Sequence, residues 1–235
     1  MTMENIFDIQ SEITRQIVMA VKGELSESEQ QVLGAKPTAN LEAYEAYLHA
    51  KAAINRADYS LEKYIEAQPW AERAIKADPF FAEAWAILAE IHAQAVWIGY
   101  DNTPERHLAA REALNQAVKL NPESASVIAA QADYFYRFDN DYPAALATYK
   151  EAAEIAPGDA RILFYMALTL RRLGEWVESI RIFERAFTLD PANVFIATQM
   201  VDTLGFMNEW DRIESLLSEW LIKYPDSNDL KANQI

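Results

Sequence analysis

The stretch LRRLGEWVESIRIFERAFTLDP, residues 170–191, describes one helix together with the signal that ends it. Pro191 has no backbone N–H, and its ring keeps the preceding residue out of the helical region, so the helix must stop there. Inside the helix, the small residues Ser179 and Ala186 flank the large Phe183. Small residues let a neighbouring helix approach closely, and a large one fills the hollow beside them. The stretch therefore predicts a helix that packs tightly against another helix.

The same pattern recurs along most of the chain. Five prolines mark it, separated by 43, 35, 34 and 34 residues: Pro79, Pro122, Pro157, Pro191 and Pro225. An alanine stands five residues before each of the first four: Ala74, Ala117, Ala152 and Ala186. A small residue also stands twelve residues before each of the same four: Ala67, Ala110, Ala145 and Ser179. The shared register predicts a series of helices that all pack in the same way.

A second apolar pattern follows each of the first four prolines. After Pro157, for example, Leu163, Met166 and Leu170 recur at spacings of three and four residues, which predicts a helix. Each repeat is therefore expected to be a helical hairpin of about 34 residues. One hairpin cannot bury its apolar face alone, so the hairpins should stack on their neighbours.

The period and the small, large and proline positions resemble the tetratricopeptide repeat family. The match is best in residues 158–191, where Gly174 stands at the turn between the helices, and weakest in residues 40–79. The resemblance implies an all-α, right-handed superhelical solenoid of about five hairpins over residues 39–225. Residues 1–38 are expected to form an N-terminal helical extension, and residues 226–235 a tail or the start of a truncated repeat. A HEAT-type array is the open alternative, although its units are longer, about 40–47 residues.

The first interval between prolines is longer than the others, which predicts an insertion of about nine residues in the second hairpin. The insertion falls around AVWIGYDNTPER, residues 95–106. Thr103 and Pro104 suit the N-cap and the first position of the following helix. At the tip of this long hairpin stand Trp97, Ile98 and Tyr100. They either fold back on neighbouring helices or form an exposed apolar contact patch.

The N-terminal extension carries an apolar stripe at helical spacing, which includes Ile6, Ile9, Ile13 and Ile17. The run NIFDIQSEITRQIV, followed by GELSESEQ and KPTANLEAYEAYL, resembles a junction in bacterial signalling proteins of the adenylate/guanylate cyclase type, ahead of their tetratricopeptide arrays. The resemblance implies a regulatory arm and a chain that is a fragment of a larger protein. The stripe would then pack on the first repeat or on another copy of the chain.

Composition and charge exclude several classes of function. The formal net charge is −15, and no basic run is longer than Arg171-Arg172, so nucleic acid is not an expected partner. The longest apolar run near the start, residues 17–21, falls far short of the roughly 20 residues that cross a bilayer, so membrane insertion is not expected. The chain has no cysteine, which fits a reducing compartment. We expect a cytoplasmic protein, and the periplasmic face of a larger membrane-anchored protein stays open as the alternative.

No motif for catalysis stands out. His49, His92 and His107 lack the paired spacing of a zinc site, and the six glycines are too scattered for a phosphate loop. No G-x-S-x-G nucleophile turn is present. We therefore expect a non-enzymatic protein without catalytic, cofactor-binding or metal-binding residues. An enzyme with an unrecognised active site has no support in the sequence.

What remains is the concave groove that the resemblance implies, lined by the first helices of the hairpins. The positions off the packing stripe should face inward. They are Ala129, Asp133, Tyr136, Arg137, Arg161, Phe164, Tyr165, Leu168, Arg171, Arg172, Thr198, Gln199, Asp202 and Phe206. Arginines and aromatic rings gather here against an acidic background.

These residues suggest what the groove binds. An arginine fork suits a carboxylate, and aromatic rings supply anchor area. We expect an acidic or C-terminal segment of a partner protein near Arg171 and Arg172, with a solvated face that pairs with neighbouring acids as the alternative. Ala86 and Ala129 stand where chaperone-binding relatives carry a clamp lysine, so that subtype is not expected. The predicted function is a protein interaction scaffold, and the alternative is a module that dimerises a signalling enzyme through the isoleucine stripe and the residue 97–100 tip.

Overall fold

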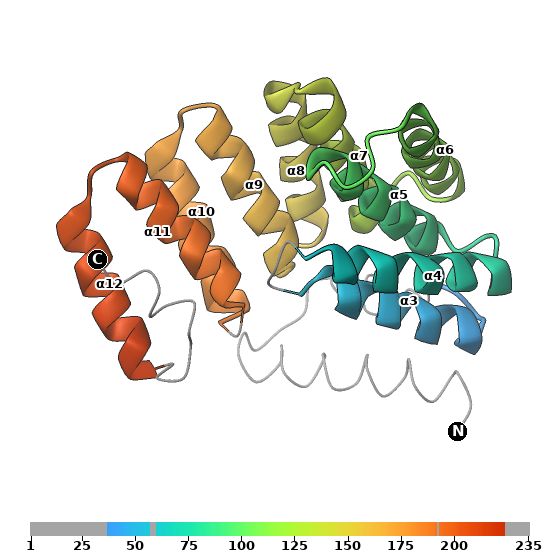
Figure 1. Ribbon diagram of the computed structural model, residues 1–235, viewed down its shortest axis with the longest axis horizontal. Helices are drawn as coiled ribbons and strands as arrows, with labels where there is room; N and C mark the ends of the chain where they lie inside the picture. The colour runs from blue at the N-terminus through green and yellow to red at the C-terminus, as the bar shows by residue number, and fades with distance from the viewer. Residues whose placement is uncertain (1–36, 57–59, 192, 224–235) are drawn as a thin grey trace.

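The computed structural model describes residues 37–56, 60–191 and 193–223, and these form helical hairpins stacked into an arc (Figure 1). The five hairpins are numbered here in chain order, each with a first and a second helix. Their elements are α3 (Leu41–Ile54) and α4 (Leu61–Ala77); α5 (Ala82–Trp97) and α6 (Pro104–Leu120); α7 (Ala125–Tyr134) with the π-helix η1 (Phe135–Asp139), and α8 (Tyr142–Ile155); α9 (Ala160–Arg172) and α10 (Trp176–Leu189); α11 (Val194–Phe206) and α12 (Trp210–Lys223). The predicted all-α solenoid of hairpins is confirmed.

The small residues of the repeat lie in the interior of the array. All eight are fully buried: Ala67, Ala74, Ala110, Ala117, Ala145, Ala152, Ser179 and Ala186. Ser179 also donates a hydrogen bond from its hydroxyl to the backbone oxygen of Ala167 in α9, at 2.8 Å. A larger side chain at these positions would push two helices apart, because protein cores have no spare volume.

The turns between the two helices of hairpins 3 to 5 also repeat. A residue with positive φ stands two positions before each second helix: Asn140 at 52°, Gly174 at 80° and Asn208 at 60°. In hairpins 4 and 5 the backbone N–H of the next residue closes the first helix, from Glu175 to Leu170 at 3.0 Å and from Glu209 to Leu204 at 3.1 Å. This left-handed closure is the usual C-terminal cap of a helix.

Hairpin 3 has one residue more than hairpin 4, which explains its 35-residue spacing. The first helix absorbs this residue by ending in the π-helix η1. The closing hydrogen bond now runs from the Asp141 N–H to the Phe135 oxygen, at 3.0 Å, one residue further than in hairpins 4 and 5. Single π turns of this kind are frequent at functional sites. Here the π turn carries the buried residues Tyr136 and Arg137.

The insertion in hairpin 2 lies where the sequence predicts it. α5 runs on to Trp97, and α6 begins after Thr103, whose hydroxyl accepts a hydrogen bond from the Arg106 N–H at 3.3 Å. Trp97 lies against hairpin 3, with its ring centroid 6.4 Å from that of Tyr136, and Ile98 packs on the core of hairpins 1 and 2. Ile98 is half-buried there, whereas Trp97 keeps 40% of its surface exposed, so the tip combines features of both interpretations.

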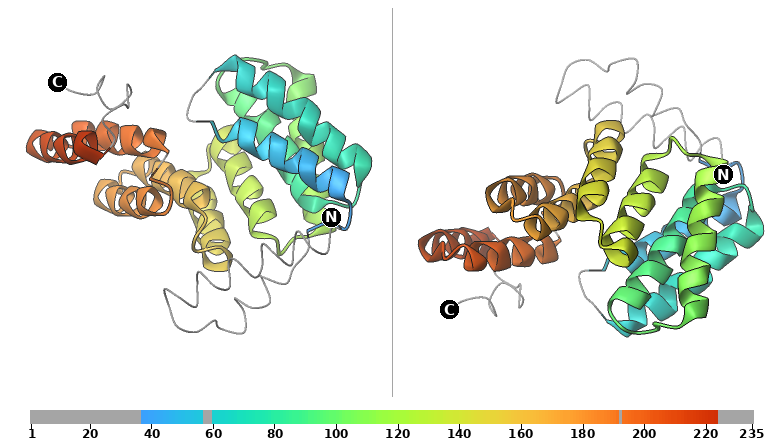
Figure 2. Two further views of the ribbon diagram at one scale, coloured as in Figure 1. Left: turned by 90° about the horizontal axis from the view of Figure 1, so that it is seen from below. Right: turned by 90° about the horizontal axis from the view of Figure 1, so that it is seen from above.

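Two clusters of buried apolar side chains form the core, and they meet at α7. Val127 and Ala130 of α7 pack with hairpins 1 and 2, whereas Ile128 and Ala129 pack with hairpins 4 and 5. The two views of Figure 2 show the first two hairpins gathered on one side of α7 and the last two on the other. Among the described residues, no helix is both long enough and apolar enough to cross a membrane.

Candidate functional site

The concave side of the arc encloses a cavity of about 120 Å³. Because the array curves, residues near both of its ends reach this cavity, so all five hairpins contribute to its wall. The lining residues are Ile54, Asn55, Arg56, Lys63, Gln94, Trp97, Tyr136, Arg137, Arg161, Phe164, Tyr165, Leu168, Asp190, Asn193, Phe195 and Ile196. Five of them are aromatic, so the wall combines flat apolar surfaces with polar groups.

The charged groups on this wall are mostly cations. Arg56, Lys63, Arg137 and Arg161 come from four different helices or turns, and Asp190 is the one carboxylate among the lining residues. The chain as a whole carries a formal charge of −15. Three of these cations are paired with carboxylates beside the wall: Arg56 with Glu66, Arg137 with Asp133 and Arg161 with Glu90.

With Lys63, Arg137 is one of two buried cations on this wall. Its side chain is 5% exposed, and its Nε donates to both carboxylate oxygens of Asp133, each at 2.8 Å. The guanidinium carbon lies 5.1 Å from the ring centroid of Trp97, 5.2 Å from that of Tyr165 and 5.9 Å from that of Tyr136. Such cation–π contacts hold a guanidinium in one orientation.

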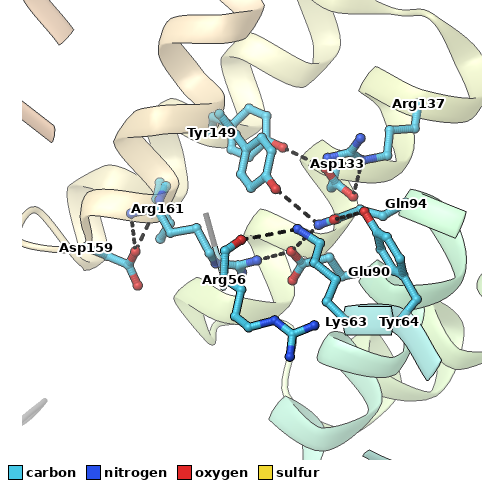
Figure 3. A network of polar contacts seen from close by, with 12 residues as sticks. Arg56, Lys63, Tyr64, Glu90, Gln94, Asp133, Arg137, Tyr149, Asp159 and Arg161 are labelled. Atoms are coloured by element: carbon cyan, nitrogen blue, oxygen red, sulfur yellow. Dashed lines mark hydrogen bonds and ion pairs between the residues drawn. The ribbon is translucent and has the colours of Figure 1, made fainter. Parts of the chain in front are cut away.

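Arg161 joins two hairpins that are not neighbours. Its guanidinium in α9 forms an ion pair with the buried carboxylate of Glu90 in α5 (Figure 3). The backbone around Arg161 is held as well, because the N-cap residue Asp159 accepts hydrogen bonds from the N–H groups of Arg161 and Ile162, at 2.9 and 3.1 Å. Removing Arg161 would leave the buried Glu90 carboxylate without its counter-ion.

Gln94 is the centre of a second set of contacts behind the cavity. Its amide nitrogen donates to Glu90 at 2.7 Å and to the Tyr165 hydroxyl at 3.1 Å, and its amide oxygen accepts from the Tyr64 hydroxyl at 3.1 Å. The Tyr149 hydroxyl donates to Asp133 at 3.3 Å (Figure 3). Helices α4, α5 and α9 are therefore linked through one amide.

Burial and neighbouring charges decide the protonation of these groups. Burial opposes the charge of Arg137 and Arg161, but the carboxylates of Asp133 and Glu90 outweigh it and raise the pKa of each arginine above its ordinary value. Burial likewise raises the pKa of the Tyr149 and Tyr165 hydroxyls. At neutral pH the wall therefore carries permanent positive charge beside neutral phenols.

The structure brings together about half of the residues predicted to line the groove. Six of them line the cavity: Tyr136, Arg137, Arg161, Phe164, Tyr165 and Leu168. Asp133 and Ala129 lie directly behind it, against Tyr149. The α11 positions Thr198, Gln199, Asp202 and Phe206 are not among the lining residues.

Arg171 and Arg172 lie outside the cavity wall. Arg171 contacts α11, with hydrogen bonds to the side chains of Gln199 at 3.0 Å and Thr203 at 3.2 Å. Arg172 donates to the Tyr136 hydroxyl at 3.2 Å and is solvent-exposed. Both arginines thus connect α9 to neighbouring hairpins, and the enclosed positive charge belongs to Arg137 and Arg161 instead.

Sequence reasoning missed several residues of this site. Glu90 and Gln94 carry a readable signal, because they are polar residues four apart on a helix whose other central residues, apart from His92, are apolar and buried. Buried polar groups are usually hydrogen-bonded, so such a pair indicates a polar network. Arg56 and Asn193 stand in connections between helices and have no comparable signal.

The residues predicted for self-association divide into two groups. Ile6, Ile9, Ile13 and Ile17 lie outside the described residues. Trp97 lies on the cavity wall, Ile98 is half-buried, and Tyr100 is 43% exposed at the hairpin tip. Within the part of the chain that the structure describes, no group of three His, Asp or Glu residues could hold a metal ion.

Comparisons with known proteins agree with this architecture. Residues 104–160 and 129–194 match the tetratricopeptide repeat family. Among solved structures, TTC0263, a thermophilic TPR protein of Thermus thermophilus, is 20% identical, with a TM-score of 0.59 over 80% of this chain and 95% of that one. PilF of Pseudomonas aeruginosa is 17% identical, with a TM-score of 0.49 over 81% and 90%. YrrB, described as a TPR protein with an unusual peptide-binding site, is 14% identical, with a TM-score of 0.48 over 88% and 97%.

No curated protein matches the chain. The family match covers hairpins 3 and 4 together with α6, which are the parts with the 34- and 35-residue spacings. Hairpins on either side of the matched range are also helical hairpins, and those before it have the same buried small residues. Residues 104–194 are therefore similar to the tetratricopeptide repeat family, and the rest of the described chain shares the helical-hairpin fold.

Proposed function

We propose that this chain is a non-enzymatic scaffold that binds a segment of a partner protein on its concave face. The observation that supports this function most is the cavity to which all five hairpins contribute, with Arg137 and Arg161 on its wall. Each repeat supplies a few contacts to this surface, and such an extended concave surface is what repeat proteins use to bind another chain. Its aromatic and arginine side chains are the types that contribute most to protein interfaces.

The partner segment is proposed to be acidic or to end in a free C-terminal carboxylate. Four cations against one carboxylate on the wall favour a negative ligand. The positions proposed to contact it include the six predicted residues on the cavity wall, with Arg171, Arg172, Gln199, Asp202 and Phe206 further along the groove.

The wider setting is a proposal that rests on the N-terminal resemblance. Under this proposal, the chain is a cytoplasmic regulatory arm of a bacterial signalling protein of the cyclase type. The alternative function is self-association, and it depends on Tyr100, which is 43% exposed, and on the isoleucine stripe. Light scattering over a wide concentration range separates the two, because only self-association makes the mass rise with concentration.

The test compares two charge-reversal variants as baits in lysate of the source cells. Arg56→Glu/Arg172→Glu reverses two exposed arginines on the concave face, and Arg181→Glu/Arg185→Glu makes the same charge change on exposed positions of α10. Partners held by the wild type and the α10 variant but lost by the concave variant support the proposal. Retention of every partner by the concave variant, with an unchanged helical spectrum, contradicts it.

A further inference from the structure

The inner face of α7 is covered by side chains from the helices on either side of it. Ala129 and Asp133, which the sequence places on the groove side of α7, are only 4% and 3% exposed. They line a space of about 10 Å³ together with Glu90 of α5 and with Arg161 and Tyr165 of α9. That space holds no more than about one water molecule. The middle of the concave face is therefore closed, because side chains of α5 and α9 meet in front of α7.

Two polar contacts hold α5 against α9. The carboxylate of Glu90 pairs with the guanidinium of Arg161 (Figure 3), and the amide nitrogen of Gln94 donates to the Tyr165 hydroxyl at 3.1 Å. Ala129 of α7 ends at its Cβ, so the longer side chains of the flanking helices reach each other over it. Both contacts skip one hairpin, whereas repeat arrays are normally held by contacts between neighbours. A change in the curvature of the array would therefore break them.

The space that remains on the concave face is too small for a segment of another chain. The cavity of about 120 Å³ equals the share of about four water molecules in the liquid, at roughly 30 Å³ each. One small amino-acid residue fills that volume. A partner segment that lies along the concave face therefore needs this face to be wider than it is in the described conformation.

The contact between α5 and α9 is polar, whereas the contacts on either side of it are apolar. Hairpins 1 and 2 share one apolar cluster, hairpins 4 and 5 share the other, and α7 contributes to both. Separating α5 from α9 exposes carboxylate, guanidinium, amide and phenol groups, all of which water can pair, so it costs less than opening an apolar cluster. α7 can therefore stay packed on both flanks while its inner face opens.

We propose that the α5–α9 contacts are a latch that holds the concave face closed, and that a partner segment gains access when hairpins 2 and 4 separate about α7. This inference rests on the proposed function and adds the regulation of the same site. The described conformation is the closed one, in which the protein blocks its own groove. Only the open fraction binds, so the latch lowers the apparent affinity for the partner by that fraction.

A single introduced thiol reports the opening, because the chain has no cysteine of its own. Ala129→Cys places the thiol on the covered face of α7, and Ala152→Cys places it in the apolar cluster, where Ala152 is fully buried. The reaction with the thiol reagent DTNB is followed at low urea concentrations. We expect the Ala129→Cys rate to depend weakly on urea, since opening exposes little surface, and the Ala152→Cys rate to rise steeply, since it requires unfolding.

A variant without the latch gives the second comparison. Glu90→Ala/Gln94→Ala removes both contacts from the α5 side and keeps the arginines of the concave face. We expect it to raise the Ala129→Cys rate at least tenfold and to change the Ala152→Cys rate far less. Glu112→Ala/Gln116→Ala is the matched control, because it removes the same residue types at the same spacing from exposed positions of α6. It should leave both rates as in the wild type.

The latch is overturned if the two thiols have the same urea dependence in the wild-type background, a result that does not require the latch variant to fold. It is also overturned if a folded latch variant leaves the Ala129→Cys rate unchanged. In either case the proposed function still stands if the concave variant Arg56→Glu/Arg172→Glu loses its protein partners.

Partner capture tests whether the latch controls access. The partners that count are those held by the wild type and lost by the concave variant, and the latch variant should capture several-fold more of them from the same lysate. Unchanged capture by a latch variant whose Ala129→Cys rate has risen overturns the control of access and leaves the scaffold function in place. If no partner depends on the concave variant, the scaffold function fails, and the access control that rests on it fails too, whatever the thiol rates.

Discussion

The amide nitrogen of Gln94 donates a hydrogen bond to the hydroxyl of Tyr165, although the two residues are 71 positions apart. The contact joins hairpin 2 to hairpin 4 across the concave side of the arc. Repeat arrays are usually stabilised by contacts between neighbouring repeats only. Here Gln94 and the nearby ion pair of Glu90 with Arg161 add contacts between repeats that are not neighbours.

Replacing Gln94 tests this link. Gln94→Leu removes three hydrogen bonds, with Tyr64, Glu90 and Tyr165, from a buried position. We expect a loss of about 1–3 kcal/mol in the free energy of unfolding, the cost of leaving buried polar groups unpaired. Urea denaturation followed by circular dichroism measures it. Gln116→Leu, on an exposed position of α6, should change the stability by less than about 0.5 kcal/mol.

The buried pair of Asp133 and Arg137 gives a second prediction. Asp133→Ala leaves the 95% buried Arg137 without its counter-ion, and we expect a loss of about 3–5 kcal/mol. The double variant Asp133→Leu/Arg137→Met replaces both charges with apolar groups and should recover most of that loss. A double-mutant cycle from denaturant midpoints checks this. Equal stability of the single and the double variant would contradict the claim that Asp133 compensates a buried charge on Arg137.

His92 makes the stability depend on mild acid. Burial and the positive charge of Arg106, whose Nη1 lies 2.7 Å from the His92 Nδ1, lower the pKa of His92 to about 4 from an ordinary 6.5. Below pH 6.5 the imidazole of His92 binds a proton in the unfolded chain, whereas in the folded chain it binds one only near pH 4. The stability contributed by neutral His92 is therefore complete above pH 6.5 and falls as the pH drops towards 4, by on the order of 3 kcal/mol.

The measurement is the free energy of unfolding between pH 7 and pH 4. Other carboxylates also titrate in this range, so the informative quantity is the difference between wild type and His92→Gln. We expect the variant to have a shallower pH dependence, whereas His49→Gln, at an exposed position, should keep the wild-type slope. Parallel curves for wild type and His92→Gln would show that His92 is not buried in its neutral form.

The turn of hairpin 4 gives a prediction about the backbone. Gly174 has a φ of 80°, and an added Cβ would meet only the Trp176 side chain, at 3.8 Å. Gly174→Ala should therefore cost about 1–2 kcal/mol through backbone strain and not through a clash. Gly158 has no positive φ and open space around it, so Gly158→Ala should leave the stability unchanged or raise it slightly. Thermal melting of both variants separates strain from crowding.

The repeat made most of the fold predictable, because its signals are local. The prolines and the fully buried alanines set the hairpins, and Thr103 with Pro104 set the start of α6. The π-helix was not predicted, although the extra residue that causes it is visible in the 35-residue spacing. A one-residue difference does not tell by itself whether a loop or a helix absorbs it.

The site was only partly predictable, because it depends on the curvature of the whole array. Arg137 and Arg161 were assigned to the groove from their helix faces, and they lie on the cavity wall. Arg171 and Arg172 stood out as the one basic run, yet they contact α11 and Tyr136. No local pattern could place Lys63 of hairpin 1 and Asn193 near hairpin 5 on the same wall, since that depends on the summed rotation of the hairpins between them.

Helix α7 contributes side chains to both apolar clusters, with Val127 on one side and Ile128 on the other. No cut through the array leaves both halves with a complete interior, because a cut before α7 opens the first cluster and a cut after it opens the second. We therefore expect residues 41–223 to behave as one minimal folding unit, with a single cooperative transition. Shortened versions of this chain for structural or binding work should keep all five hairpins.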